Sequence, residues 1–195
     1  MIRGYPFDKR SIGTDVPRYV ALFKGINVGK AKRIAMDDLR VLLGKLGFTD
    51  VQTLLNSGNA VFTAAAESAL KLAEQIRQAV HTGTGVDALV IVKSSKDLAA
   101  IVAGNELGKV ATDPSRLLVA ITNDNKSLKP VEALAGAAWG DDRIHVGRHA
   151  AYLWCAKGVL ESEALEALLK GLKGSGTTRN WTTLNKIHAL MDKDG

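Results

Sequence analysis

Cysteine, aromatic side chains and long apolar runs are all scarce in this sequence of 195 residues. Cys155 is the only cysteine, so an internal disulfide is excluded and a reducing compartment is the simpler expectation. No apolar run approaches the roughly 18 residues that a membrane-spanning helix needs. Because 46% of the residues are hydrophobic, the chain can bury a core without a metal or disulfide. We therefore expect a soluble, cytoplasmic protein with no membrane partner.

Motifs for metal binding and nucleophilic catalysis are also missing. The sequence has no Cys-x-x-Cys or His-Glu-x-x-His spacing, and His145 and His149 fall on an expected hairpin. Cys155 lies in an apolar stretch, which favours a small buried hydrophobic residue over a nucleophile. His81 ends an expected helix and is a candidate acid or base, although a helix-terminal histidine favoured by the helix dipole is the commoner explanation. We predict no metal and no cofactor, and the catalytic residues stay unknown.

Positive charge, by contrast, is concentrated near the start of the chain. The net charge is +6, and residues 1–40 hold nine Lys or Arg against four Asp. Such a segment suggests an anionic partner, although lysines on a protein surface often contact only solvent. Residues 1–18 contain Pro and Gly without periodicity, so we expect a flexible leader there.

Residues 19–93 have the order strand, helix, strand, strand, helix, strand, which is the ferredoxin-like split βαβ pattern. The expected strands are residues 19–26, 51–55, 60–64 and 87–93, and the apolar positions of the two helices fall within 36–46 and 70–80. The segment "NSGN" at 56–59 joins the middle strands, because Asn and Gly tolerate the positive φ of a tight turn.

Residues 116–195 begin the same pattern again. Strands are expected at 116–122, 143–147 and 151–156, and helices at 130–139 and 165–172. Where a fourth strand should follow, residues 177–191 have helical spacing, which places Arg179 and Asn180 in the first turn of a C-terminal helix. The predicted fold is α+β, with two ferredoxin-like (split βαβ) subdomains whose antiparallel sheets carry helices on one face, plus this C-terminal helix. The expected divisions are 1–18, 19–93, a connecting helix and loop at 94–115, and 116–195.

In the split βαβ sheet the strand order is 4-1-3-2, so the end of the first strand lies beside the start of the third. This geometry brings the "GINVGK" loop, the "NSGN" turn and the "TGTGVD" segment at 82–87 to one edge of the first subdomain. Glycine-rich turns offer backbone N–H groups to a phosphate or carboxylate, and Lys32 and Arg33 add charge. An arginine in a first helical turn opposes the helix dipole and suggests a bound anion or an acidic neighbour. The predicted ligand-binding residues are Lys24, Gly25, Asn27, Gly29, Lys30, Ser57, Gly58, Asn59, Arg179 and Asn180. The alternative is that these glycines and asparagines serve only turn geometry.

Two segments carry a family resemblance. The stretches "ALFKGINVGKAKRIAMDDLRVLLGKLGFTDVQTLLNSGNAVF" and "TTRNWTTLNKI" resemble the bacterial family known as domain of unknown function 1697, over residues 19–191. The resemblance implies a two-subdomain α+β protein with ferredoxin-like parts and no established activity. The chain departs from the usual pattern at Lys24 (Arg in the family), Lys30 (Gly) and Ala35 (Pro). Residues 158–165 read "GVLESEAL" where the family tends to have a Gly-x-x-x-Ser-Lys-Leu segment.

Three functions remain open from the sequence. The leading hypothesis is a site for a small phosphorylated or carboxylated ligand at the edge of the first subdomain, with Lys24 and Arg179 neutralising its charge. The first alternative is single-stranded RNA binding through the ferredoxin-like sheet, for which Phe23 and Phe62 are the only aromatic candidates. The second alternative is a protein-interaction module without a small ligand. The sequence leaves enzymatic activity and oligomeric state undecided.

Overall fold

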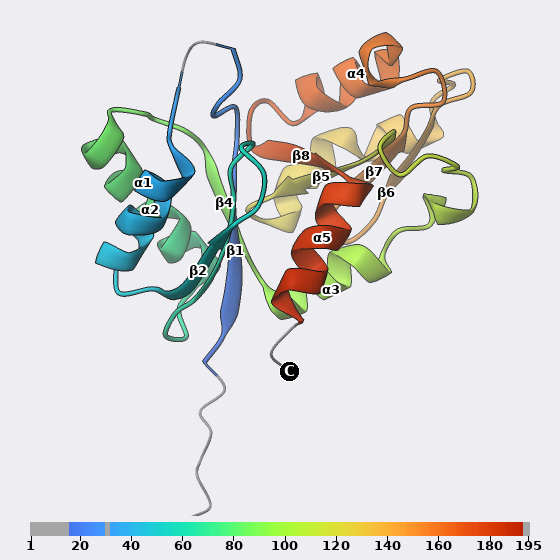
Figure 1. Cartoon of the computed structure of the whole chain (residues 1–195). Helices are drawn as coiled ribbons and strands as arrows, with labels where there is room; N and C mark the ends of the chain where they lie inside the picture. Colours follow the sequence, from blue (N-terminus) through green and yellow to red (C-terminus); the bar gives the residue numbers. More distant parts are fainter. Residues whose placement is uncertain (1–15, 30–31, 193–195) are drawn as a thin grey trace, which may run out of the picture.

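The computed structural model describes residues 16–29 and 32–192 and contains two antiparallel four-stranded sheets (Figure 1). The first sheet has the order β2-β3-β1-β4 and the second β6-β7-β5-β8. This confirms the α+β class with two antiparallel sheets, and the first sheet has the 4-1-3-2 order expected of the split βαβ pattern. Of the predicted leader, residues 1–15 lie outside the described residues, and the expected divisions after residues 18, 93 and 115 stay predictions.

Each sheet is built from one half of the chain. The first sheet consists of β1 (Arg18–Phe23), β2 (Thr49–Thr53), β3 (Asn59–Thr63) and β4 (Val90–Ser94), with helices α1 (Met36–Lys45) and α2 (Ala69–Thr84). The second consists of β5 (Leu117–Thr122), β6 (Arg143–Val146), β7 (Ala151–Trp154) and β8 (Gly176–Asn180), with the 3-10 helix η2 (Asn125–Gly136) and α4 (Glu163–Gly171). The remaining helices are α3 (Ser95–Ala103), α5 (Trp181–Met191) and the short 3-10 turns η1 (Leu107–Lys109) and η3 (Val159–Glu161).

The C-terminal segment corrects the sequence prediction. A fourth strand does exist in the second half, because β8 pairs with β5 from Gly176 opposite Thr122 to Asn180 opposite Leu118. Arg179 is therefore a strand residue rather than part of a helical turn. Asn180 caps α5, since its side chain accepts a hydrogen bond from the backbone N–H of Thr183 at 2.9 Å. The strand was missed because its inward positions carry Thr and Arg instead of apolar side chains.

The segment expected as a helix at 130–139 is also different. It is the 3-10 helix η2, which begins five residues before Pro130 and ends at Gly136. Asp124 starts it by accepting a hydrogen bond from the backbone N–H of Ser127 at 2.9 Å. A proline inside the segment removes one backbone donor, which disfavours a regular α-helix there.

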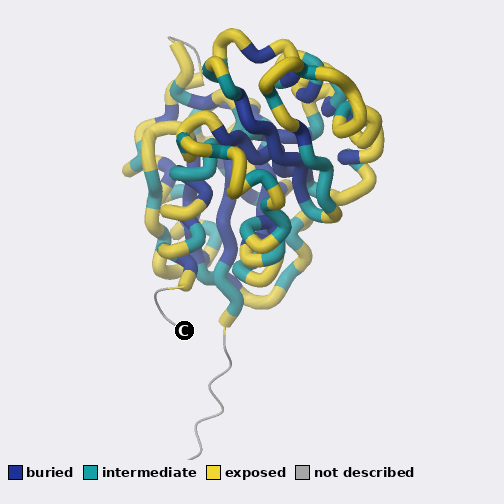
Figure 2. The backbone as a smooth tube through the Cα atoms, turned by 90° about the vertical axis from the view of Figure 1, so that its right-hand side faces the viewer, coloured by how far each residue is buried: buried dark blue, intermediate teal, exposed yellow. Residues whose placement is uncertain are grey.

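Sheets and helices alternate in layers. Helices α1 and α2 cover the outer face of the first sheet, and η2 with α4 cover the outer face of the second. The predicted helices on one face of each sheet are these outer ones. The inner faces are covered as well, which was not predicted from the sequence. Between the sheets, α3 and α5 contribute Leu98, Ile101, Leu184 and Ile187 to a shared core. Figure 2 shows the resulting buried strands beneath an exposed exterior. None of the helices in the described residues has the length and apolar character to cross a membrane.

Candidate functional site

The three loops predicted to meet at one edge of the first sheet are in contact. The side-chain amide of Asn27 donates a hydrogen bond to the backbone carbonyl of Asn56 at 2.9 Å, which joins the β1–α1 loop to the β2–β3 turn. The ammonium of Lys32 donates to the backbone carbonyl of Asp87 at 3.0 Å, which joins the same loop to the segment before β4. The expected gathering of loops is therefore present.

Asn27 fixes the shape of the β1–α1 loop. Its backbone has φ +56°, a conformation that asparagine tolerates better than most residues. Its side chain also donates to the backbone carbonyl of Ile34 at 2.9 Å and accepts from the backbone N–H of Ile34 at 2.8 Å. Because both amide N–H groups are engaged within the protein, Asn27 positions the loop and has no N–H donor to spare.

Arg179 reaches across from the second sheet and is buried against the first (8% exposed). Its Nε donates to Asn59 Oδ1 at 2.5 Å, and Nη1 donates to Thr177 Oγ1 at 2.9 Å and to the carbonyl of Thr178 at 2.8 Å. Its Nη2 donates to the carbonyl of Phe23 at 2.7 Å and that of Gly58 at 3.1 Å. The five N–H groups of a guanidinium are thereby all engaged.

This arrangement gives Arg179 a different role from the one expected. The N–H groups of Arg179 donate to oxygens of the protein itself. The side chain therefore joins the two sheets instead of presenting donors to a ligand. Among the described residues no carboxylate pairs with it, and burial lowers its pKa to about 10. The side chain remains charged at neutral pH, and neutral oxygens alone stabilise the charge.

The β2–β3 turn is shaped by the same contact. Asn59 is completely buried, and its amide donates to the carbonyl of Leu54 at 2.8 Å and to Ser57 Oγ at 3.2 Å. Gly58 has φ +79°, and a Cβ there would lie 2.6–2.8 Å from side-chain atoms of Ile26 and Phe23. The turn-geometry alternative therefore accounts for Gly58 and Asn59.

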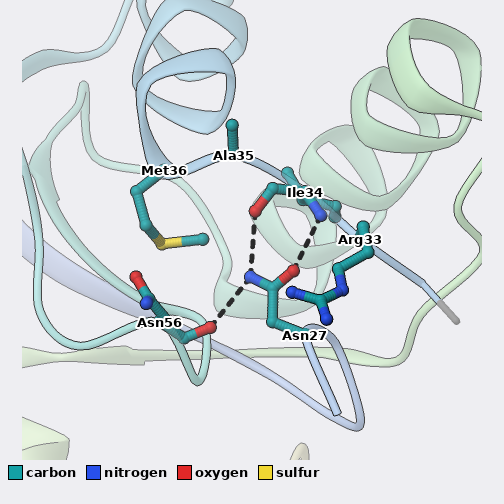
Figure 3. Close-up of a pocket in the computed structure, with 6 residues that line it drawn as sticks. All are labelled: Asn27, Arg33, Ile34, Ala35, Met36 and Asn56. Carbon is teal, nitrogen blue, oxygen red and sulfur yellow. Dashed lines mark hydrogen bonds between the residues drawn. The ribbon is translucent and has the colours of Figure 1, made fainter. Parts of the chain in front are cut away.

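A cavity of about 370 Å³ opens beside this turn (Figure 3). It lies between the β1–α1 loop, the start of α1 and the β2–β3 turn. The described residues that line it are Asn27, Arg33, Ile34, Ala35, Met36 and Asn56. Arg33 is the one charged side chain in this set, so the lining is cationic.

The start of α1 adds polarity to the same cavity. Ala35 precedes the helix and cannot cap it, whereas each of the four other α-helices in the described part of the chain begins with a Ser or Asn side-chain cap. Among the described residues, no side chain accepts a hydrogen bond from the first N–H groups of α1. Asp37 and Asp38 stand in this first turn, but neither lines the cavity.

The chain is similar to known proteins in both sequence and fold. A family model described as "Protein of unknown function (DUF1697)" matches residues 16–152, about two thirds of the chain. The chain belongs to the DUF1697 family. Its structure is similar to a solved structure titled "The structure of conserved bacterial protein SP0830 from Streptococcus pneumoniae", with a TM-score of 0.75 and 24% sequence identity. The match covers 91% of this chain and 99% of that one, and it shows a shared fold. A search of curated proteins found no match.

In this DUF1697 chain, the predicted binding residues fall into separate groups. Asn27 lines the cavity, while Asn59, Arg179 and Asn180 are occupied by contacts within the protein. Gly25 and Gly29 have φ of +67° and +63°, and nothing lies within 4 Å of the place where a Cβ would stand.

Of the other predicted residues at this edge, those that the structure describes do not line the cavity. Ser57 is exposed, and its hydroxyl accepts a hydrogen bond from the side-chain amide of Asn59. The ammonium of Lys24 donates to the backbone carbonyl of Gly174 at 3.4 Å. Lys30 lies outside the described residues.

Sequence reasoning did not select Asn56, Ile34 or Met36. Two of the lining residues could have been found from the sequence. Asn56 belongs to the turn segment "NSGN", and Arg33 is one of the cations of the β1–α1 loop. The missing information was the return of the chain after Asn27, which brings Ile34 back to its side chain.

The structure removes the basis for RNA binding on an open sheet face. Phe23 and Phe62 are completely buried under α1 and α2, and α3 and α5 cover the opposite face of the first sheet. Bases therefore find no exposed aromatic platform on this sheet.

The remaining reactive side chains do not extend the site. Cys155 is buried, and burial raises the pKa of its thiol. His81 is exposed on α2 and does not line the cavity. Within the described residues, no group of three or more His, Cys, Asp or Glu could hold a metal ion.

Proposed function

We propose that this protein binds a small phosphorylated or carboxylated ligand in the cavity beside Arg33 and Asn56. The observation that carries the proposal is the composition of the cavity: about 370 Å³, a single arginine as the charged side chain among its described lining residues, and no carboxylate. A guanidinium offers paired N–H donors that match carboxylate and phosphate oxygens.

The surrounding geometry supports an anion at this place. The uncapped start of α1 directs backbone N–H groups and the positive end of the helix dipole toward the same region. Ile34 and Met36 supply an apolar wall against which the carbon part of a metabolite packs. Asn27 holds the loop in shape, so the site needs little reorganisation on binding.

The proposed site is one for binding, and no reaction is assigned to it. Catalysis by proton transfer needs an acid or base within reach of the ligand. The described lining residues include no His, Asp, Glu, Cys or Lys.

A thermal-shift screen against phosphorylated metabolites, small carboxylates, nucleotides and short single-stranded RNA tests the function. A ligand present at ~100 times its dissociation constant stabilises the fold by ~2.7 kcal/mol, which raises the melting temperature by about 5–11 °C. We expect Arg33→Ala to weaken binding of the responding anion by about tenfold or more, because it removes the charged donors.

Arg148→Ala is the matched control. Arg148 is also an exposed arginine, it does not line the cavity, and its loss changes the net charge equally. Equal weakening by both variants would indicate general charge attraction instead of a site. A thermal shift with RNA alone would contradict the metabolite proposal. The absence of a shift with every compound would also contradict it, and would favour a protein-interaction module.

A further inference from the structure

A second cavity, of about 280 Å³, lies at the opposite end of the first sheet, where it meets the second. Its lining comes from the start of α2, β4, α3, the segment after β5 and the β6–β7 turn. The residues are Ala69, Lys93, Asp97, Ile101, Asn123, Asp124, Asn125 and His149. This cavity shares no described residue with the one beside Arg33.

Lys93 is the most unusual of these residues. It lies on β4 among the apolar positions of the sheet and is 8% exposed. Its ammonium has three N–H donors, and within the described residues one of them is engaged, with the backbone carbonyl of Asn123 at 3.2 Å. Desolvation lowers the pKa of Lys93, opposed by the charges of Asp97 and Asp124. A buried cation with unspent donors is costly unless an acceptor is supplied.

Hydrogen-bond acceptors that line the same cavity are also left partly unsatisfied by the described residues. Asn123 Oδ1 is buried, and none of the described residues forms a hydrogen bond with it. Asp97 Oδ2 accepts from Ser94, and Asp124 Oδ1 accepts from Ser127, which in each case leaves the other carboxylate oxygen unengaged by the described residues. Neither carboxylate lies within 4.0 Å of the Lys93 ammonium, so the opposite charges flank the cavity without forming an ion pair with it.

This combination of a buried ammonium and two carboxylates matches a ligand that carries one negative and one positive group. A simple anion would accept from Lys93 but would meet two carboxylates. A simple cation would pair with the carboxylates but would leave the Lys93 donors empty and be repelled by its charge. A ligand that carries a carboxylate and an ammonium close together satisfies both sets of groups.

We propose that the cavity around Lys93 binds a small zwitterion of the α-amino acid class. The carboxylate of the ligand accepts from Lys93, and its ammonium donates to the unengaged oxygens of Asp97 and Asp124. The cavity volume suits an amino acid with a short side chain. This site is independent of the proposed anion site.

The test is calorimetric titration with glycine, L-alanine and L-serine, each compared with analogues that lack one charge. For alanine these are propionate, without the ammonium, and alanine methyl ester, without the carboxylate. We expect at least one amino acid to bind about tenfold tighter than both of its analogues. Arg33→Ala should leave this binding unchanged, which separates the result from the anion site.

Lys93→Met should reduce amino acid binding by about tenfold or more. Methionine fills a similar volume without a charge, so the variant is expected to fold, and a thermal melt checks this. Lys96→Met is the matched control, because Lys96 is exposed three residues further along and does not line the cavity. Asp124→Asn keeps a side chain able to cap η2 and should narrow the preference for alanine over propionate.

Three results would overturn the proposal. The first is no heat or thermal shift with any of the three amino acids at millimolar concentration, which would leave the polar groups to ordered water. The second is equal binding of propionate or of the ester, which would reduce the cavity to a site for a single charge. The third is unchanged amino acid binding in a folded Lys93→Met variant.

Discussion

Replacement of Arg179 by alanine should lower the free energy of unfolding by about 3–5 kcal/mol. The substitution removes the donors for the carbonyls of Phe23 and Gly58 and for Asn59 Oδ1, which stay buried. It also removes the hydrogen bonds that join β8 to the first sheet, so the contact between the two halves weakens. Equilibrium unfolding in urea, followed by circular dichroism, measures the effect.

Arg179→Lys should rescue little of this loss, because an ammonium has three donors and lacks the planar fork of the guanidinium. Lys186→Ala is the control for loss of a cation in the C-terminal segment, since Lys186 is exposed on α5, and it should change stability by less than about 0.5 kcal/mol. If Arg179→Ala proves as stable as the control and loses only ligand binding, the joining role is wrong and the ligand role predicted from the sequence is restored.

Substitution of Gly58 by alanine is expected to cost about 2–5 kcal/mol. Two causes add: the residue has φ +79°, which is strained for any residue with a Cβ, and the new methyl would lie within 2.8 Å of Ile26 and Phe23. The same substitution shifts the turn that carries Asn56, so anion binding in the neighbouring cavity should weaken too. Urea unfolding and the ligand thermal shift report the two effects separately.

Gly29→Ala separates strain from crowding. Gly29 has a similar φ of +63°, but nothing lies within 4 Å of the position of its Cβ. We expect this variant to lose only the strain contribution, about 1–2 kcal/mol. Equal losses in the two variants would show that the contact with Ile26 and Phe23 relaxes at little cost.

The first half of the fold was accessible from the sequence because its elements carry strong local signals. The buried run of β1, the apolar stripes of α1 and α2 and the turn at 56–59 predicted the strand order that the structure has. The second half was less accessible, because β8 carries Thr and Arg at its inward positions and η2 contains a proline. Pairing with β5, not its own composition, defines β8.

The candidate site shows the same division. The sequence brought the correct loops together, since antiparallel pairing of the first and third strands determines which turns share an edge. It could not show how the polar side chains at that edge are used. Asn27, Asn59 and Arg179 have the composition of a binding site, yet the hydrogen bonds that they make are internal.

By itself, the sequence determined the α+β class, the family and the edge at which glycine-rich loops and cations gather, because periodicity, turn residues and charge are local properties. Only the tertiary structure decided that Arg179 joins the two sheets, that Arg33 and Asn56 face a cavity, and that Lys93 is buried near Asp97 and Asp124 without an ion pair to either. These outcomes depend on groups that are distant in the chain, and a buried polar side chain must find its partners wherever the packing places them.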